Sequence, residues 1–467
     1  ALQMATLTLE KMAAGGIHDQ VGGGFHRYAT DARWLVPHFE KMLYDNAQLA
    51  VIYIEGYQAT GRADFARVSR ETLDYLIREM RAPGGGFYSA TDADSEGIEG
   101  KFFIWRVDEI DALLDPKAAA LVKAYYGMTP GGNFEHANIL HVAATLEEAA
   151  RAAGVKIADA RATLDAAREK LYAARLKRVP PLTDTKVIVA WNALAVSAFA
   201  RGALVLDEPR YAAEAKRTGD FILQRMEKDG RLKRIWKDGR AKAAGTLDDY
   251  AFLAAGLLDL YEVTWDPKYI AAAKRLSDTL EAHFRDEKSG GYFMTPSDGE
   301  ALIARQKPAH DGALPSGNSV AALNLLRLAE FTSDDAYRER SDAVVRGASA
   351  VLLRGPRSLT KMLSALDFRH DLPKEIVLVK ATPEGDAGPL LAELRRAFVP
   401  NRVIAVTAGG EAASKLAQTV PLAEGKTAID GKTTAYVCER EVCALPTSDP
   451  EVFAKQIGSV RKYSEVD

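Results

Sequence analysis

Residues 15–46 read GGIHDQVGGGFHRYATDARWLVPHFEKMLYDN. The stretch holds three of the chain's eight histidines, a triple glycine, and Arg, Tyr, Asp, Trp, Glu and Lys in close succession. Polar and aromatic side chains of so many types gather where they converge on a ligand or a reacting group. We therefore expect this stretch to form part of a functional site.

The stretch runs into the first of four segments that share one layout. Each segment opens an apolar helix with Asn or Tyr and places an aromatic residue 19 positions later, where a second helix begins. The first helices are rich in Ala and Leu nearly all round, whereas the second helices carry one apolar stripe and one charged face. This alternation predicts an inner ring of buried helices and an outer, half-solvated ring. The four segments are 46–65, 192–211, 250–269 and 318–337.

The intervals between these segments leave room for further helices. Helical stretches near 106–126 and 145–176 occupy the longest interval, and residues 1–14 add an N-terminal helix. The sequence therefore predicts a mainly α fold, an (α/α)6 toroid of helical hairpins over residues 1–370. From residue 371 on, short β-branched runs alternate with helices, which predicts a small α/β domain over 371–467.

A second repeat consists of glycine-rich loops. GGGFHRYATD (22–31), GGGFYSATD (84–92) and GGYFMTPSD (290–298) each place glycines, then aromatic residues, then an Asp. Glycines allow a tight reversal after an outer helix, and the aromatic residues favour short strands. We expect these loops to lie together at one mouth of the toroid.

Composition and charge narrow the class of protein. The 467 residues are 47% hydrophobic and 27% charged, as in a globular protein with a large core, and the net charge of −3 indicates no nucleic-acid partner. No uninterrupted apolar run approaches the roughly 18 residues of a membrane span, so we expect none. The two cysteines, Cys438 and Cys443, lack a CxxC spacing and predict paired reduced thiols and a cytoplasmic location. We find no phosphate-binding fingerprint and expect no cofactor.

Several motifs closely resemble one family over essentially the whole chain. They are GGGFHRYATDARWLVPHFEKMLYDNAQLA (22–50), TDADSEG (91–97), GGNFEHANILH (131–141), TDTKVIVAWNAL (183–194) and LPSGNSVAALNLLRL (314–328). The family is that of the thioredoxin-domain-containing proteins related to spermatogenesis-associated protein 20. The resemblance implies a thioredoxin-like domain ahead of a chain that starts in mid-helix, and a toroid similar to N-acylglucosamine 2-epimerases and six-hairpin glycosidases.

The histidines suit epimerase chemistry. A 2-epimerase takes a proton from the carbon next to a carbonyl and returns one to the other face, and histidine serves both steps near neutral pH. The candidate catalytic histidines are His26, His38 and His310. Alternatively, His38 braces the helix that follows and His26 hydrogen-bonds within the glycine loop.

The carboxylates suit glycoside hydrolysis, which uses one protonated and one ionised carboxyl group. Several candidates directly precede an inner helix, where an Asp also caps the helix. The candidates are Asp45, Asp92, Asp94, Asp184, Asp248, Asp249 and Asp311, of which we favour Asp92 and Asp249 for catalysis. Residues 92–103 match only half of a calcium-binding loop, so we expect no metal site there.

The remaining polar candidates are expected to bind substrate. Arg27 can stabilise an enolate, and an aromatic ring can form a platform for a sugar. The full set is Arg27, Tyr28, Trp34, Glu40, Asp45, Asp94, Lys186, Trp191, Asn192, Asp311 and Asn318. The sequence thus favours a toroid that acts on a sugar, with epimerase-like proton transfer ahead of hydrolysis. The alternative is a non-catalytic module that docks a thioredoxin-like domain or another protein partner.

Overall fold

The computed structural model describes residues 1–440 and 442–459. The chain divides into two units. Unit 1 comprises residues 1–53, 64–82 and 87–185, and unit 2 comprises residues 54–63, 83–86 and the chain from 186 on. The boundary expected near residue 370 falls inside unit 2, between α14 (Thr360–His370) and β12 (Lys374–Val379).

Unit 1 combines helices with short strands. Its strands β3, β4 and β7 form a three-stranded sheet, and β1 pairs with β2 as β5 pairs with β6. Helix α2 begins in unit 1 and ends in unit 2. The elements are α1 (Leu2–Ala14), β1 (Tyr28–Ala29), β2 (Pro37–His38), β3 (Lys41–Met42), α2 (Leu43–Thr60), α3 (Ala63–Tyr75), the π-helix η1 (Leu76–Met80), β4 (Ala90–Thr91), β5 (Asp94–Ser95), β6 (Ile98–Glu99), α4 (Val107–Leu113), α5 (Pro116–Tyr125), α6 (Leu146–Ala153), α7 (Ile157–Arg175) and β7 (Thr183–Asp184).

Helices α4 to α7 fill the interval between the first two repeats and have a core of their own. Trp105, Leu121 and Leu171 are buried in this core. Helix α6 shows why such short helices are well defined: Thr145 caps its first turn, and Gly154 ends it in the left-handed region, with φ of 64°. The helical stretches expected near 106–126 and 145–176 are confirmed.

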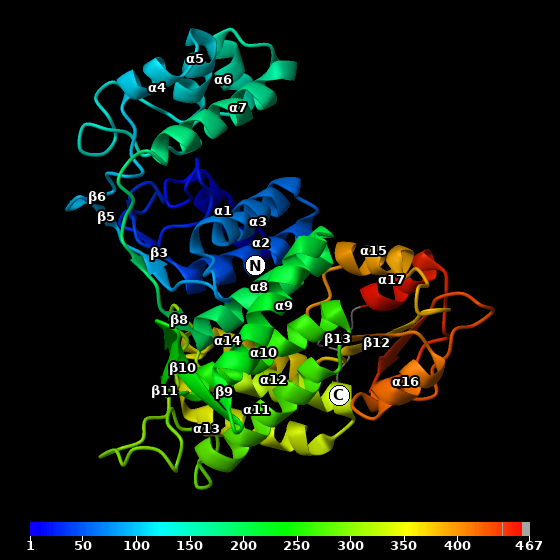
Figure 1. Cartoon of the computed structure of the whole chain (residues 1–467). Coiled ribbons are helices and arrows are strands. Elements are labelled where there is room, and N and C mark those ends of the chain that lie inside the picture. Colours follow the sequence, from blue (N-terminus) through cyan, green and yellow to red (C-terminus); the bar gives the residue numbers. More distant parts are fainter. Residues whose placement is uncertain (441, 460–467) are drawn as a thin grey trace. The chain divides into compact units, whose positions relative to one another are not determined.

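Unit 2 contains three successive helical hairpins and a C-terminal α/β part. Helix α10 packs against both α8 and α12, and these three first helices are largely buried (Figure 1). Gly256 permits close packing of α8 and α10, because a Cβ there would lie 2.8 Å from the Ala193 carbonyl oxygen. The helical elements are α8 (Val189–Leu206), α9 (Pro209–Arg225), α10 (Leu247–Thr264), α11 (Lys268–Phe284), α12 (Gly317–Thr332), α13 (Asp335–Arg354) and the short η2 (Pro356–Ser358).

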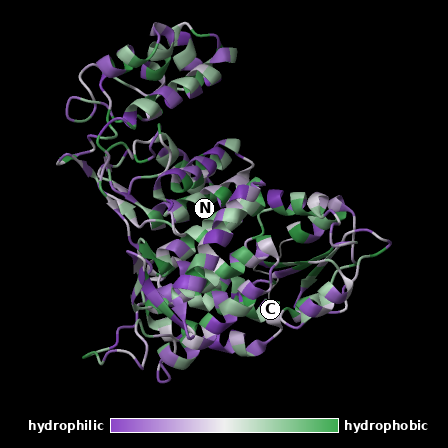
Figure 2. Ribbon diagram, in the orientation of Figure 1, coloured by the Kyte–Doolittle hydropathy of each residue, from purple (hydrophilic) through white to green (hydrophobic). Residues whose placement is uncertain are grey.

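A small antiparallel sheet joins the segment before α8 to the segment between α9 and α10. Strands β8 (Val187–Ile188), β10 (Arg231–Lys237) and β11 (Arg240–Ala244) form it, and β9 (Glu227–Lys228) pairs with β10. Strand β10 (RLKRIWK) is largely hydrophilic, in contrast to β8 (VI) and the apolar helices α8 and α10 (Figure 2).

The repeat of 19 positions corresponds to the helical hairpins. Its second aromatic residues, Phe65, Tyr211, Tyr269 and Tyr337, are all buried at the start of an outer helix. One detail of the prediction is wrong. The Asn or Tyr does not open the inner helix but lies within its first turn, as Asn46 does in α2 and Asn192 does in α8, because a short strand leads directly into each of these helices.

Asparagines in these first turns hold the glycine loops. The Asn46 side chain accepts a hydrogen bond from the Phe25 amide (2.7 Å) and donates to the Phe25 carbonyl (3.0 Å). Asn318 holds Tyr292 in the same way, at 2.8 and 2.9 Å. The glycine before each aromatic residue is needed for close approach, since a Cβ on Gly24 would lie 3.0 Å from the Asn46 Oδ1 atom.

The C-terminal part is a four-stranded sheet in the order β13, β12, β14, β15. β12 is parallel to β13 and antiparallel to β14, and every residue of β12 is buried. Helices α15 and α17 lie at one side of the sheet and α16 at the other (Figure 1). The further elements are α15 (Gly388–Arg396), β13 (Arg402–Thr407), α16 (Gly410–Ala417), η3 (Pro421–Ala423), β14 (Thr434–Glu439), β15 (Val442–Cys443) and α17 (Pro450–Gly458).

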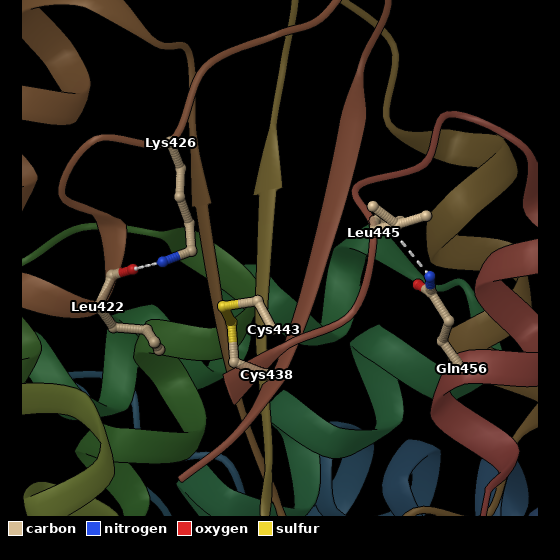
Figure 3. The surroundings of a disulfide bond; sticks show 6 residues. All are labelled: Leu422, Lys426, Cys438, Cys443, Leu445 and Gln456. Carbon is tan, nitrogen blue, oxygen red and sulfur yellow. Dashed lines mark hydrogen bonds between the residues drawn. A yellow bond between two sulfur atoms is a disulfide. The ribbon is translucent and has the colours of Figure 1, made fainter. Parts of the chain in front are cut away.

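Cys438 and Cys443 form a disulfide across the β14–β15 hairpin (Figure 3). The expectation of reduced thiols is therefore wrong. The two residues are direct cross-strand partners, and their Cα atoms are 3.9 Å apart. A spacing of five in the sequence did not indicate that a hairpin places them opposite each other.

The predicted fold class is confirmed. The chain is mainly helical, its hairpins show the inner and outer layers of α/α toroids, and a small α/β part follows. One helix, α8, is long and apolar enough to cross a membrane by length and composition, and 67% of it is buried inside the protein, as in the core helix of a globular fold.

Candidate functional site

A cluster of polar side chains in unit 1 includes five of the residues singled out in the 15–46 stretch. We call it the polar cluster, and its members surround the start of α2 and the β1–β2 and β5–β6 hairpins. The pairing of β1 with β2 sets Tyr28 opposite His38, and the two rings stack with centroids 5.0 Å apart. The polar cluster consists of Arg27, Tyr28, His38, Glu40, Tyr44, Asp45 and Glu99.

Ion pairs connect the members of the polar cluster. The Arg27 Nη1 atom lies 2.9 Å from the Glu40 Oε2 atom. His38 binds two carboxylates: its Nδ1 atom is 2.7 Å from the Glu99 Oε1 atom, and its Nε2 atom is 3.7 Å from the Glu40 Oε2 atom. The imidazole is thus oriented by its hydrogen bond to Glu99, while the 3.7 Å contact to Glu40 is too long for a hydrogen bond, and the ring remains 29% exposed.

Asp45 is the member with the most unusual environment. Burial raises the pKa of its carboxyl group to about 7, and the negative charge of Glu40 adds to the rise while Arg27 opposes it. Its Oδ2 atom is buried and has no hydrogen-bond partner among the described residues. A buried polar oxygen without a partner is rare in folded proteins and is a feature of sites that bind or react.

A buried charge cluster supports the glycine loop that leads to the polar cluster. Asp19 lies 2.8 Å from Lys41 Nζ and 2.8 Å from Arg175 Nη1, and all three side chains are at most 4% exposed. The two cations hold the pKa of Asp19 well below its usual value despite burial. Asp19 also accepts the amide hydrogens of Val21 and Gly22, so the cluster fixes the turn that opens the loop.

His26 belongs to the protein interior and not to the polar cluster. It is 2% exposed, its Nδ1 atom lies 2.8 Å from the Phe39 carbonyl oxygen, and its ring packs edge-on against Phe39 and Phe103. Burial lowers its pKa to about 3, so the imidazole is neutral. This burial argues against the catalytic role expected for His26, and its side-chain hydrogen bond reaches Phe39, beyond the glycine loop, instead of a partner within that loop as the alternative supposed.

Asp248 and Asp249 begin α10 in unit 2 and have different environments. Asp249 is fully buried and accepts hydrogen bonds from Thr246, Ala190 and Arg234, which is the pattern of a capping residue and argues against the catalytic role expected for it. Asp248 accepts one from the Gly317 amide (3.1 Å). Burial, together with the charge of Asp249, raises the pKa of Asp248 to about 6.

Two further candidates of unit 2 hold backbone together. Asp311 accepts the amide hydrogens of Ser316 and Lys361, both at 2.8 Å, and so ties a loop to the start of α14. Asn318 holds Tyr292, as described above. Both side chains are thus occupied by the backbone, which argues against their expected role in binding substrate.

The other candidates lie outside the polar cluster. His310 is exposed in the loop that precedes α12. Asp92 and Asp94 are exposed, and Asp92 bonds the amides of its own turn. The remaining five are Trp34 and Asp184 in unit 1, and in unit 2 Lys186 just before β8 and Trp191 and the buried Asn192 in the first turn of α8.

Sequence reasoning missed three contributions to this site. Glu99 binds His38 from 61 positions away, and Arg175 binds Asp19 from 156 positions away, so no local pattern indicates either pair. Tyr44 precedes Asp45 directly and reads as a core aromatic residue. Within residues 1–440 and 442–459, no group of three or more His, Cys, Asp or Glu side chains is arranged to hold a metal ion.

Comparison with known proteins identifies relatives of the chain by sequence. No protein-family model matches it. Human spermatogenesis-associated protein 20 is 37% identical over 486 aligned positions, which cover 96% of this chain and 62% of that protein. The chain thus spans about three fifths of the length of the curated relatives it matches.

Similar solved structures include two sugar-processing enzymes. Cellobiose 2-epimerase from Bacillus thermoamylovorans is 11% identical, with a TM-score of 0.44 and coverage of 79% of this chain and 70% of that one. The GH76 α-mannanase BT2949 from Bacteroides thetaiotaomicron is 13% identical, with a TM-score of 0.42 and coverage of 75% and 71%. The chain is a relative of spermatogenesis-associated protein 20, and the family resemblance drawn from its motifs is confirmed over almost its whole length.

Proposed function

We propose that the polar cluster is the active site of a sugar epimerase or isomerase, which moves a proton at the carbon next to a carbonyl group. The observation that carries the proposal is the carboxyl group of Asp45, which has a pKa of about 7 and one buried oxygen without a partner among the described residues. Such a group is substantially protonated at neutral pH and can donate its proton to a reacting carbon.

The neighbours of Asp45 supply the other groups that this reaction needs. His38 acts as the base that removes the proton: its Nδ1 atom is held by the hydrogen bond to Glu99, and its Nε2 atom, which has no hydrogen bond at 3.7 Å from Glu40, accepts the proton. The electron pair of the broken C–H bond moves onto the carbonyl oxygen, where the Arg27 guanidinium stabilises the negative charge. Asp45 then returns a proton to the opposite face of the carbon, and the carbonyl group forms again.

A sugar also needs a surface on which to lie. Tyr28 is 49% exposed and stacks on His38 with its ring nearly parallel, at 20°. One ring face is therefore supported by the imidazole, and the exposed part of the phenol is available to the C–H face of a sugar ring. The surrounding carboxylate and guanidinium groups are suitable partners for hydroxyl groups.

Hydrogen exchange at the reacting carbon tests the proposal directly. We expect the protein, incubated in D2O with N-acylhexosamines and free hexoses, to exchange the C2 hydrogen of at least one sugar, measured by proton NMR. Asp45→Asn and His38→Gln should each slow this exchange by about 100-fold or more. Asp159→Asn, at an exposed position of α7, should leave it unchanged. Exchange that is undetectable for every sugar, or equally fast in Asp45→Asn, contradicts the proposal.

A second candidate function rests on Asp248 of unit 2. Its raised pKa of about 6 and its neighbour Asp249 are the features of a protonated carboxyl group next to another carboxyl group, as used in glycoside hydrolysis. The two functions differ in their products. Release of reducing sugar from oligosaccharides that Asp248→Asn abolishes, with no exchange at C2, would favour hydrolysis over epimerisation.

A further inference from the structure

A cavity in unit 2 lies at the C-terminal ends of the inner helices, away from the groups considered so far. Its volume is about 70 Å³, and the loop between α15 and β13 contributes to its wall. One buried water needs about 10–15 Å³ of cavity volume. This cavity therefore has room for on the order of five waters, or for one ion as large as five waters. The charged side chains in its wall are Glu55, Arg201, Asp259, Glu262, Arg327 and Arg402.

The carboxylates of this cavity are already paired. Arg201 binds Glu55 at 2.8 Å and Asp259 at 3.2 Å. Arg327 binds Asp259 at 2.8 Å and Glu262 at 3.0 Å. Two arginines and three carboxylates thus form one continuous chain of ion pairs, and each carboxylate in it has a guanidinium partner.

Two further cations, Arg402 in the wall and Lys361 near it, have no carboxylate within ion-pair distance among the described residues. Arg402 donates a hydrogen bond to the Val399 carbonyl, and its buried Nε atom has no partner in the described part of the chain. Lys361 lies near enough for Arg201, Glu55 and Asp259 to act on its ammonium group. The charged residues of the wall are three arginines and three carboxylates, and Lys361, which lies outside the wall, adds one positive charge nearby.

An excess positive charge in a confined space is costly without a counter-ion. Burial lowers the pKa of both Lys361 and Arg402, and the neighbouring arginines lower it further. The carboxylates of the chain of ion pairs oppose that effect only in part. An anion in the cavity would accept a hydrogen bond from the free Nε–H group of Arg402 and compensate the positive charge.

We propose that this cavity binds a small oxyanion of the size of inorganic phosphate between Arg402 and the chain of ion pairs formed by Arg201 and Arg327. Planar guanidinium groups with free donors match tetrahedral oxyanions well, because two N–H groups can meet two oxygens. The wall is built jointly by inner helices and by the start of β13, so the anion would join the α/β part of unit 2 to its helices.

Calorimetric titration of the full chain with sodium phosphate tests this site. Ionic strength is held constant with the salt of a bulky organic sulfonate that the cavity cannot admit. We expect saturable binding of one phosphate per chain. Arg402→Met and Lys361→Met should each weaken the affinity by about tenfold or more, since the first removes a charge-assisted hydrogen bond and the second a nearby positive charge. Arg396→Met, which alters an exposed arginine of α15, should bind as the parent does.

Phenyl phosphate separates free phosphate from the phosphate group of a larger molecule. The cavity should exclude it, so it should bind at least tenfold more weakly than inorganic phosphate. Absence of saturable phosphate binding by the parent overturns the proposal, as does equal binding of phenyl phosphate. Unchanged affinity in either folded variant at 402 or 361 overturns it too, and if one of these variants fails to fold, the other decides.

Discussion

Asn46 hydrogen-bonds both the amide and the carbonyl group of Phe25, 21 positions earlier in the chain. One side chain thus satisfies both backbone groups of Phe25, while the neighbouring backbone of the loop bonds residues 17–19. Asn318 does the same for Tyr292. These contacts explain why the glycine loops and the first turns of the inner helices repeat together in the sequence.

Loss of this asparagine side chain should destabilise the fold. Asn46→Ala leaves the amide and carbonyl of Phe25 buried without partners, which we expect to cost about 2–5 kcal/mol in the free energy of unfolding. Asn318→Ala should have an effect of similar size, because the contacts are equivalent. Denaturant unfolding measures both, and Gln3→Ala, at an exposed position of α1, is the control. If Asn46→Ala loses no more unfolding free energy than the control does, solvent must replace the hydrogen bonds of the side chain.

Comparing Gly24 with Gly97 separates the cost of a left-handed backbone conformation from the cost of a steric clash when a glycine is replaced. Both have φ near 75°, a left-handed conformation that favours glycine. A Cβ on Gly24 would lie 2.4 Å from the Tyr75 ring, whereas nothing lies within 4 Å of one on Gly97. We expect Gly97→Ala to cost about 1 kcal/mol and Gly24→Ala several times more. Equal melting temperatures for the two variants would contradict this.

The carboxyl group of Asp45 should make stability depend on pH. Its pKa is raised in the folded state from 3.8 to about 7, so the folded protein binds this proton more tightly than the unfolded chain does. The resulting stabilisation is complete below pH 3.8 and is lost as the pH rises through about 7. The difference in unfolding free energy between parent and Asp45→Asn should therefore fall from pH 4.5 to pH 7.5. Asp159→Asn should show no such trend.

Asp19 compensates two buried cations, Lys41 and Arg175. Asp19→Asn keeps the shape of the side chain but leaves both charges buried without a counter-charge, so we expect a loss of about 3–5 kcal/mol. Lys41→Met should cost less, because the Asp19–Arg175 pair survives. Urea unfolding of the two variants shows which of them loses more stability. A smaller loss for Asp19→Asn than for Lys41→Met would mean that water reaches the buried charge cluster.

The disulfide should contribute little to global stability. It joins residues only five positions apart, and the entropy that a crosslink removes from the unfolded chain falls with loop length. We expect the double variant Cys438→Ala with Cys443→Ala to lose about 2 kcal/mol or less. Thiol titration in denaturant should find no free thiol before reduction and two after it. Free thiols in the unreduced protein would contradict the disulfide.

Much of the fold could be predicted because its repeats are local. The 19 positions between a polar residue and a buried aromatic residue, such as Asn318 and Tyr337, equal the length of one inner helix and the turn that leads to the outer helix. The disulfide hairpin was not predictable in this way. The second strand, β15, is only two residues long and gives no sequence pattern of its own, so nothing marked Cys438 and Cys443 as neighbours.

The candidate site was predictable only where it is continuous in the sequence. Arg27, Tyr28, His38 and Glu40 are close in the chain and meet through one short hairpin. The burial that sets the pKa values of His26 and Asp45 depends on residues that are distant in the sequence. Burial decides that His26 is inert and that Asp45 retains a proton, and burial depends on the packing of the surrounding unit.

The bond between Phe25 and Asn46 closes the intervening residues into a loop with fixed ends. Insertions at its exposed tip, around residues 32–33, can be absorbed locally, since the ends do not move. A change of length between Glu40 and Asn46 is different, because it would rotate Asp45 about the axis of α2 and away from Arg27. Among related chains, length variation should therefore be confined to the tip, and the segment from Glu40 to Asn46 should vary in residue type alone.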